Sequence, residues 1–310
     1  MRKICFVLGF FCSALLATAQ VDVTATGGTA NASYTTLKAA VDAVNAGTHT
    51  GAITINITAN TTETAISVLN GSGAGAASYT SILIRPTADG LTIAGPSAQG
   101  RGLIELNGAD NVTIDGDNPN TPGINRNLTI TNTISSTTTY ASVIRIVAYT
   151  SVITSADNNT IKNLIINGHA SGRNIATATS TTASENTSYA ILAGARGTAV
   201  PATEETAPTA VSSISTLLGS GGTIGNLVIT NNEVNRASRG IMAQGSATTV
   251  FPGLIISDNV VGNSAGGAAD QIYAIGIAVN GTANGIVSGN TVYVEGYVAS
   301  SASNQAIGIG

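Results

Sequence analysis

Three segments near the C-terminal end of the chain repeat one pattern. In each copy a short apolar strand leads to an asparagine, one variable residue and a valine: NLVITNNEV (226–234), GLIISDNVV (253–261) and GIVSGNTV (285–292). Between these copies lies a second series of apolar segments, in which AIGI begins at residue 274 and again at residue 306. Two interleaved strand families that each return after roughly 30 residues predict a coiled chain, with the strands of one coil stacked on those of the next.

Short strands of the same kind fill the chain before the repeat. Segments such as AITINIT, NVTIDG and NLTITN alternate apolar and small polar residues and end at Gly, Asn, Asp or Pro, which is typical of strands bounded by turns. We therefore expect an all-β fold, a right-handed parallel β-helix, with Val, Ile and Leu inside and strands about 4.8 Å apart. In such a stack Asn232, Asn259 and Asn290 predict a structural asparagine ladder, each side chain bonded to the next.

One segment has helical periodicity instead. In YTTLKAAVDAVNAG the apolar residues fall on one face, and a threonine at its start is a suitable N-cap. The spacing predicts a helix over residues 35–46 that caps the N-terminal end of the coil.

The remaining segments complete the expected domain plan. A flexible leading segment covers residues 20–33, and the β-helix runs from 34 to 310. Two stretches rich in Ser, Thr, Ala and Pro predict loop insertions at about 172–188 and 193–223. Because NQAIGIG ends inside a strand pattern, we expect the chain to continue beyond residue 310 in a longer polypeptide.

Residues 1–19 have the pattern of a secretory signal peptide, with Arg2 and Lys3, an apolar stretch and a final A-x-A site. Both cysteines, Cys5 and Cys12, lie inside it, so we expect no disulfide or thiolate site in the mature chain. Without Arg2 and Lys3 the chain has 10 basic and 16 acidic residues, which gives a net charge of about −6. This negative charge argues against a nucleic-acid partner. No later segment has the length and hydropathy of a membrane span.

The run from LNGADNVTIDG through NNTIKNLIINGHA to GLIISDNVV resembles the right-handed parallel β-helix repeats of large secreted and cell-surface proteins. YTTLKAAVDAVN followed by AITINI is similar to the capping helix and first strand of pectin-lyase-like β-helices. The signal ending ATAQ resembles those of exported Bacteroidota proteins, which often leave by type IX secretion. The resemblance covers about residues 34–310. It implies a fold but no particular activity, because the repeats encode coils rather than chemistry.

Three acids, Asp110, Asp115 and Asp117, lie close together in NGADNVTIDGDNP. The resemblance implies that lyases of this fold bind calcium with clustered carboxylates, so Asp115 and Asp117 are the candidate Ca²⁺ ligands. The alternative is a turn, because the alternation of NVTID points Asp115 outward and DGDNP is a common turn sequence. The sequence favours the turn.

Arg145 and His169 are the remaining candidates for catalytic residues. A lyase needs an Arg or Lys to take a proton, and Arg145 is an outward strand residue whose partner the sequence does not assign. Hydrolases of this fold carry paired aspartates, a glycine-flanked His and an Arg-x-Lys, but His169 in NGHAS lacks the second glycine and the other elements are missing. A structural corner is the favoured interpretation of His169, and we expect His49, beside the helix, at the surface.

These patterns favour a non-catalytic domain, secreted or displayed on the outer cell surface. We expect an adhesin-like or structural stalk, monomeric within a longer polypeptide and without a cofactor, that presents a rigid face to an extracellular glycan or matrix. The alternative is a polysaccharide lyase or glycoside hydrolase acting on acidic glycans, with Asp115, Asp117, Arg145 and His169 as its residues. Carboxylates and a base that converge from adjacent coils would favour the enzyme, whereas a smooth Ser/Thr/Asn face would favour the stalk.

Overall fold

The computed structural model describes the chain in segments. The described residues are 19–134, 140–148, 155–169, 188–194, 222–245, 251–263, 270, 272, 275–294 and 307–309. Nearly all of the expected signal peptide and of the two expected insertions, 172–188 and 193–223, lies outside these residues. Within the described segments the regular structure is almost entirely β-strand.

Most strands belong to three sheets, which we call A, B and C. Sheet A contains, in spatial order, β2 (Asn31–Tyr34), β1 (Val21–Gly28), β3 (His49–Ile57), β6 (Tyr79–Pro86), β9 (Val112–Asp115), β12 (Thr160–Lys162), β15 (Val228–Thr230), β19 (Ile255–Ser257) and β23 (Ile286–Ser288). Sheet B contains β4 (Thr61–Thr62), β7 (Leu91–Gly95), β10 (Leu128–Asn132), β13 (Leu164–Asn167), β16 (Glu233–Asn235), β20 (Val260–Val261) and β24 (Thr291–Val292). Sheet C contains β5 (Ser67–Asn70), β8 (Gly102–Asn107), β11 (Ser142–Val147), β14 (Tyr189–Ala193), β17 (Arg239–Gln244), β21 (Ile275–Asn280) and β25 (Ile307–Ile309). A small fourth sheet pairs β18 (Phe251–Pro252) with β22 (Thr282–Ala283).

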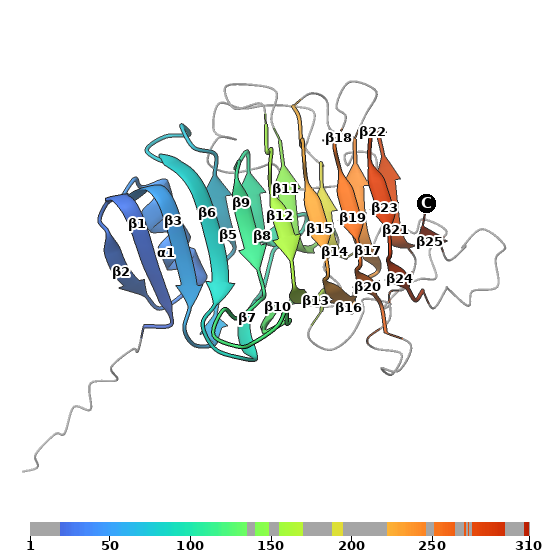
Figure 1. The fold of residues 1–310 in the computed structure, drawn as a ribbon, viewed down its shortest axis with the longest axis horizontal. Coiled ribbons are helices and arrows are strands. Elements are labelled where there is room, and N and C mark those ends of the chain that lie inside the picture. The colour runs from blue at the N-terminus through green and yellow to red at the C-terminus, as the bar shows by residue number, and fades with distance from the viewer. Residues whose placement is uncertain are drawn as a thin grey trace, which may run out of the picture.

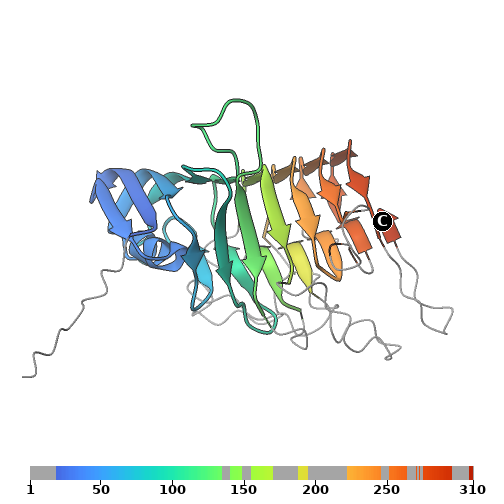
Figure 2. The same ribbon diagram turned by 90° about the horizontal axis from the view of Figure 1, so that it is seen from below.

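The chain visits these sheets in a fixed order. From β3 to β17 it adds one strand to sheet A, one to sheet B and one to sheet C, and then begins again. We call one such passage a circuit. Strands of successive circuits pair in parallel, for example β9 with β12 and β10 with β13. Figures 1 and 2 show the circuits following one another along the long axis, from the blue N-terminal strands to the red C-terminal ones. The expectation of an all-β chain with stacked parallel sheets is confirmed.

The core lies between the sheets, where equivalent residues of successive circuits stack. On sheet C one such column is fully or almost fully buried and belongs to a single cluster: Ile104, Ile144, Ile191, Ile241 and Ile277. Each buried isoleucine side chain contributes about 1.5–3 kcal/mol relative to an exposed one. Each circuit therefore adds several buried apolar residues to a continuous interior.

The helix α1 (Leu37–Asn45) lies within the range that the periodicity predicts and packs on the same core. The hydroxyl of Thr36 accepts the N–H of Ala39 at 3.1 Å, which caps the first turn. The buried carboxylate of Glu63 accepts the N–H groups of Leu37 and Lys38, both at 2.9 Å, where the helix dipole favours negative charge. The buried face consists of Leu37, Ala40, Val41 and Val44.

The expectation of a flexible leading segment at 20–33 is wrong. These residues form β1 and most of β2, an antiparallel hairpin that joins the edge of sheet A through β3. Val21 and Val23 are buried in the core, while the intervening Asp22 is only partly buried. The alternation is that of a strand, but the small polar residues of VDVTATGG obscure it in the sequence.

His49 is also placed differently from the expectation. It is fully buried rather than at the surface. Its Nε2 lies 2.7 Å from the Tyr34 hydroxyl and its Nδ1 lies 2.6 Å from the carbonyl oxygen of Thr29. The hairpin covers this histidine, so its burial follows from the strands that the sequence did not reveal.

Single residues in the left-handed conformation make the corners between strands. Before sheet A these are Asn111, Asn158, Asn226, Gly253 and Asn284, and between sheets A and B they are Asn163, Asn231, Asp258 and Gly289. Asparagine, aspartate and glycine are the residues that tolerate this conformation best. The short turns after β12, β15, β19 and β23 are therefore encoded by residue type as well as by spacing.

A substitution at Asn226 tests this encoding. Asn226 has a φ of 54°, and its side chain donates to Asn158 at 2.9 Å. Asn226→Ala and Asn226→Gly both lose that bond. The difference between their unfolding free energies therefore reports the cost of the left-handed backbone conformation for a residue with a Cβ. We expect the alanine variant to be less stable than the glycine variant by about 1 kcal/mol in urea unfolding. Equal stability, or a more stable alanine variant, would contradict this assignment of the corner.

Candidate functional site

The three repeat asparagines stand at equivalent positions in successive circuits, just before the strands of sheet B. The Oδ1 atom of Asn259 accepts the backbone and side-chain N–H groups of Asn232 at 2.9 and 3.0 Å. Asn290 accepts the same two groups of Asn259 at 3.0 and 2.9 Å. Each Nδ2 group also donates to a backbone carbonyl of a sheet A strand, in Ile161, Ile229 and Ile256 respectively. The earlier circuits place leucines here: Leu91, Leu128 and Leu164.

Asp110 lies just before β9, whereas Asp115 is the last residue of that strand. Its carboxylate accepts the N–H of Asp157 at 2.5 Å and lies 3.2 Å from the hydroxyl of Ser155, both in the next circuit. Asp157 repeats the arrangement and accepts the N–H of Gly225 at 2.5 Å. Burial, together with the charge of Asp157, raises the pKa of Asp110. Asp110 therefore ties one circuit to the next.

Asp115 and Asp117 are engaged at the corner after β9. Asp115 Oδ2 lies 3.0 Å from Lys162 Nζ, and Oδ1 accepts the side-chain amide of Asn163 at 2.7 Å and the N–H of Asp117 at 3.0 Å. Asp117 accepts the N–H of Asn125 at 2.8 Å. These bonds shape a turn and link neighbouring circuits, as the turn interpretation of DGDNP predicts.

The loop that follows, residues 116–127, projects from the stack in Figure 2. At its base Gly116 lies against the next circuit, and a Cβ there would be only 1.9 Å from the carbonyl oxygen of Asn163. Asp89 holds the loop through Thr121, Asn118 and Asn127 at 2.6–2.7 Å, and the hydrogen bonds from Thr121 and Asn118 lower the pKa of Asp89. Asp89 and Asp117 thus stabilise the conformation of this loop through hydrogen bonds.

Calcium in proteins takes six to eight oxygen ligands. Among the described residues, no group of three or more His, Cys, Asp or Glu side chains is placed to hold a metal ion. Asp115 and Asp117 supply two carboxylates, and Asp115 faces a lysine ammonium that competes with a cation. A calcium site at this pair stays a prediction that needs a direct test.

Arg145 has a partner that the sequence did not reveal. It is paired in register with Glu105 on sheet C, both side chains are 0% exposed, and Arg145 Nη1 lies 3.3 Å from Glu105 Oε1. Arg101 also donates to Glu105, with its Nε 2.9 Å from Oε1, and the N–H of Gly102 donates at 2.8 Å. A signal was present in the sequence: GLIELN and SVIRIV place opposite charges at the same strand position.

The outer face of sheet C is also buried along β8, β11 and β14. Tyr140, Tyr189, Leu192 and Met242 form a second apolar cluster, separate from the interior core. Arg239 lies over the Tyr189 ring at 5.8 Å, and burial raises the pKa of Tyr189 to about 12. Sheets A and B instead alternate buried and partly exposed residues. Along β8, β11 and β14 sheet C therefore has two buried faces, and every residue of these three strands is buried.

The residues nominated for catalysis do not converge. Asp115 lies on sheet A, Arg145 on sheet C, and His169 follows the sheet B strand β13. His169 is buried, and this burial lowers its pKa. Glu105 has two cationic partners and no solvent exposure, whereas a general acid must reach the substrate. The chemistry of these groups is that of scaffold ion pairs and hydrogen bonds.

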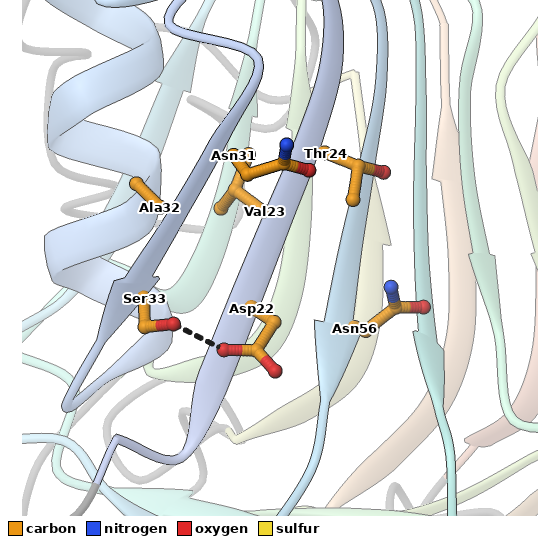
Figure 3. Close-up of a pocket in the computed structure, with 7 residues that line it drawn as sticks. All are labelled: Asp22, Val23, Thr24, Asn31, Ala32, Ser33 and Asn56. Carbon is orange, nitrogen blue, oxygen red and sulfur yellow. Dashed lines mark hydrogen bonds between the residues drawn. The ribbon is translucent and has the colours of Figure 1, made fainter.

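A solvent-accessible hollow lies at the N-terminal end of sheet A (Figure 3). Its volume is about 410 Å³. Figure 3 shows residues from β1, β2 and β3, with the Ser33 hydroxyl donating to Asp22 at 2.6 Å. The lining consists of Asp22, Val23, Thr24, Asn31, Ala32, Ser33 and Asn56. It is an open depression with a mixed polar and apolar lining and one carboxylate, that of Asp22.

No protein-family model matches the chain, and no curated protein and no solved structure matches it either. Within the described residues, no helix has the length and apolar character that a membrane crossing requires. The function must therefore be argued from the geometry of the sheets and their side chains.

Proposed function

We propose that this chain is a right-handed parallel β-helix of the pectin-lyase-like kind, secreted or displayed on the outer cell surface, that acts as a non-catalytic adhesin-like or structural domain. The fold is supported by the fixed order in which the chain visits three parallel sheets, by the asparagine ladder and by α1 at the N-terminal end. The proposal of export rests on the pattern of residues 1–19.

One observation carries the non-catalytic assignment: the carboxylates that could do chemistry are bonded to neighbouring circuits. Asp110 accepts a hydrogen bond from the N–H of Asp157, and Asp115 pairs with Lys162 and accepts a hydrogen bond from Asn163. Glu105 is buried and forms ion pairs with Arg101 and Arg145. The two carboxylates of a glycosidase need to flank one bond, and a lyase needs a base near its metal. The separation of Asp115, Arg145 and His169 onto three sheets counts against both alternatives.

Binding and cleavage measured together on the same materials test this proposal. The secreted protein, supplied with calcium, is incubated with immobilised acidic and neutral polysaccharides and with extracellular matrix. The bound protein is quantified, and the supernatant is assayed for new reducing ends and for the ultraviolet absorbance of unsaturated sugars. We expect retention on at least one material without release of products. Released products would establish an enzyme and overturn the proposal, as would the absence of binding to every material.

A further inference from the structure

The outer face of sheet A carries two continuous rows of side chains. The first, which we call the polar row, takes one residue from each of the nine strands: Ser33, Asp22, Asn56, Arg85, Asp115, Lys162, Thr230, Ser257 and Ser288. Arg85 and Asp115 directly follow Ile84 and Ile114, the last residues that pair between β6 and β9. Beside it, the second row is mostly β-branched: Asn31, Thr24, Thr54, Leu83, Thr113, Thr160, Val228, Ile255 and Ile286. At the spacing of β-strands the rows run for about 40 Å.

The charges in the polar row balance one another. The row contains two acidic residues, Asp22 and Asp115, and two basic residues, Arg85 and Lys162. Lys162 Nζ lies 3.0 Å from Asp115 Oδ2. The uncharged members also bond along the row, as between Thr230 and Ser257 at 2.9 Å. A face with paired charges gives no long-range attraction to a polyanion, and the chain as a whole has a formal charge of −4. Electrostatic complementarity therefore favours an uncharged partner.

The two rows together match the chemistry of a sugar chain. A pyranose offers hydroxyl groups at its edge and C–H groups on its faces. The polar row supplies hydrogen-bond donors and acceptors, and the adjacent row supplies partly exposed apolar groups such as Val228 and Ile255. Successive rings of an extended β-linked polysaccharide follow one another at a distance close to the strand spacing. Each circuit can thus present one residue of the polar row and one residue of the second row to one ring.

The hollow in Figure 3 lies at the N-terminal end of these rows. Asp22, Ser33 and Asn56 belong to the polar row, and Thr24 and Asn31 belong to the second row. This open hollow of about 410 Å³ is lined by members of both rows and lies where the face of sheet A ends.

We infer that the outer face of sheet A binds an extended, uncharged polysaccharide along the two rows, with the hollow at β1–β3 as a terminal subsite. This inference rests on the proposed function and assigns it a surface and a ligand class.

The test uses two matched pairs of substitutions. Thr113→Arg/Thr160→Arg places two bulky cations in adjacent circuits on the outer face of sheet A, where both threonines are partly exposed. Thr92→Arg/Thr129→Arg makes the same change in adjacent circuits of sheet B. Both pairs change two directly paired threonines of adjacent circuits to arginine, and they differ in the sheet that carries them. Circular dichroism and thermal melting establish that both variants are folded.

Binding to insoluble cellulose, chitin and a β-1,3-glucan is measured by depletion, with alginate and pectate gels as acidic comparisons. We expect wild type to bind at least one neutral polysaccharide, the sheet A variant to bind at least about tenfold more weakly, and the sheet B variant to match wild type. Equal loss in both variants, unchanged binding in the sheet A variant, or binding to acidic gels alone would overturn the inference. Retention on another material without cleavage would leave the proposed function standing while this inference failed.

Discussion

Replacing Glu105 with alanine is expected to lower the free energy of unfolding by about 3–5 kcal/mol. The side chains of Glu105 and Arg145 are both fully buried, and their ion pair is 3.3 Å long. The same carboxylate accepts Arg101 Nε at 2.9 Å and the N–H of Gly102 at 2.8 Å. Its removal leaves a buried arginine without this compensating charge, which costs far more than the loss of a surface pair.

The matched control is Glu233→Ala, which also removes a glutamate from a strand. Glu233 is 3.9 Å from Arg126, and both side chains are partly exposed, so we expect a loss of about 1 kcal/mol or less. Glu105→Gln keeps an acceptor oxygen and should fall between the two. Urea unfolding of the three variants gives the comparison. A Glu105→Ala protein as stable as the Glu233→Ala protein would mean that the buried pair is not structural.

Asn259→Ala is the second large effect, with an expected loss of about 2–4 kcal/mol. Asn259 is the middle member of the ladder. Its oxygen accepts two N–H groups of Asn232, and its amide donates to Ile229 and Asn290, both at 2.9 Å. Alanine leaves the buried N–H of Asn232 and the carbonyl of Ile229 without these partners, and each unsatisfied group costs about 1–3 kcal/mol.

The control for Asn259 is Asn167→Ala on β13. The Asn167 side chain is only partly buried and donates to Thr131 at 3.2 Å, so its loss should change stability by about 0.5 kcal/mol. Chemical denaturation under one set of conditions compares the two alanine variants. If Asn259→Ala and Asn167→Ala unfold at the same urea concentration, the ladder contributes no more than a surface hydrogen bond.

The ladder could be predicted because its members share one strand pattern at near-regular spacing. Asn232, Asn259 and Asn290 are recognisable as equivalents from the amino-acid sequence alone. Parallel stacking then fixes their contacts, since equivalent residues of successive circuits lie side by side. The helix at 35–46 was predictable for a similar reason, because four apolar residues fall on one helical face.

The contacts of Glu105 and Arg145 could not be assigned in the same way. The two residues are 40 positions apart in the sequence, and two other strands, β9 and β10, lie between them. The shared position of the two charges in GLIELN and SVIRIV does not by itself establish which strands pair. The hairpin β1–β2 was not predicted because Thr, Ala and Gly make the alternation of apolar and polar residues in β1 hard to recognise. The burial of His49 depends on that hairpin and was missed with it. Long-range register and weakly patterned strands thus mark the limit of prediction from this sequence.

The central claim is that the carboxylates at the corner after β9 are parts of the scaffold, and calcium dependence tests it most directly. The melting temperatures of wild type and of Asp115→Ala/Asp117→Ala are measured in excess calcium and in a chelator. Because the aspartates bond to Lys162, Asn163 and Asn125, we expect the double variant to melt lower by the same amount in both conditions, and wild type to show no calcium shift. A calcium-dependent rise of the wild-type melting temperature that disappears in the double variant would contradict the account, since a ligand that binds only the folded state must stabilise it.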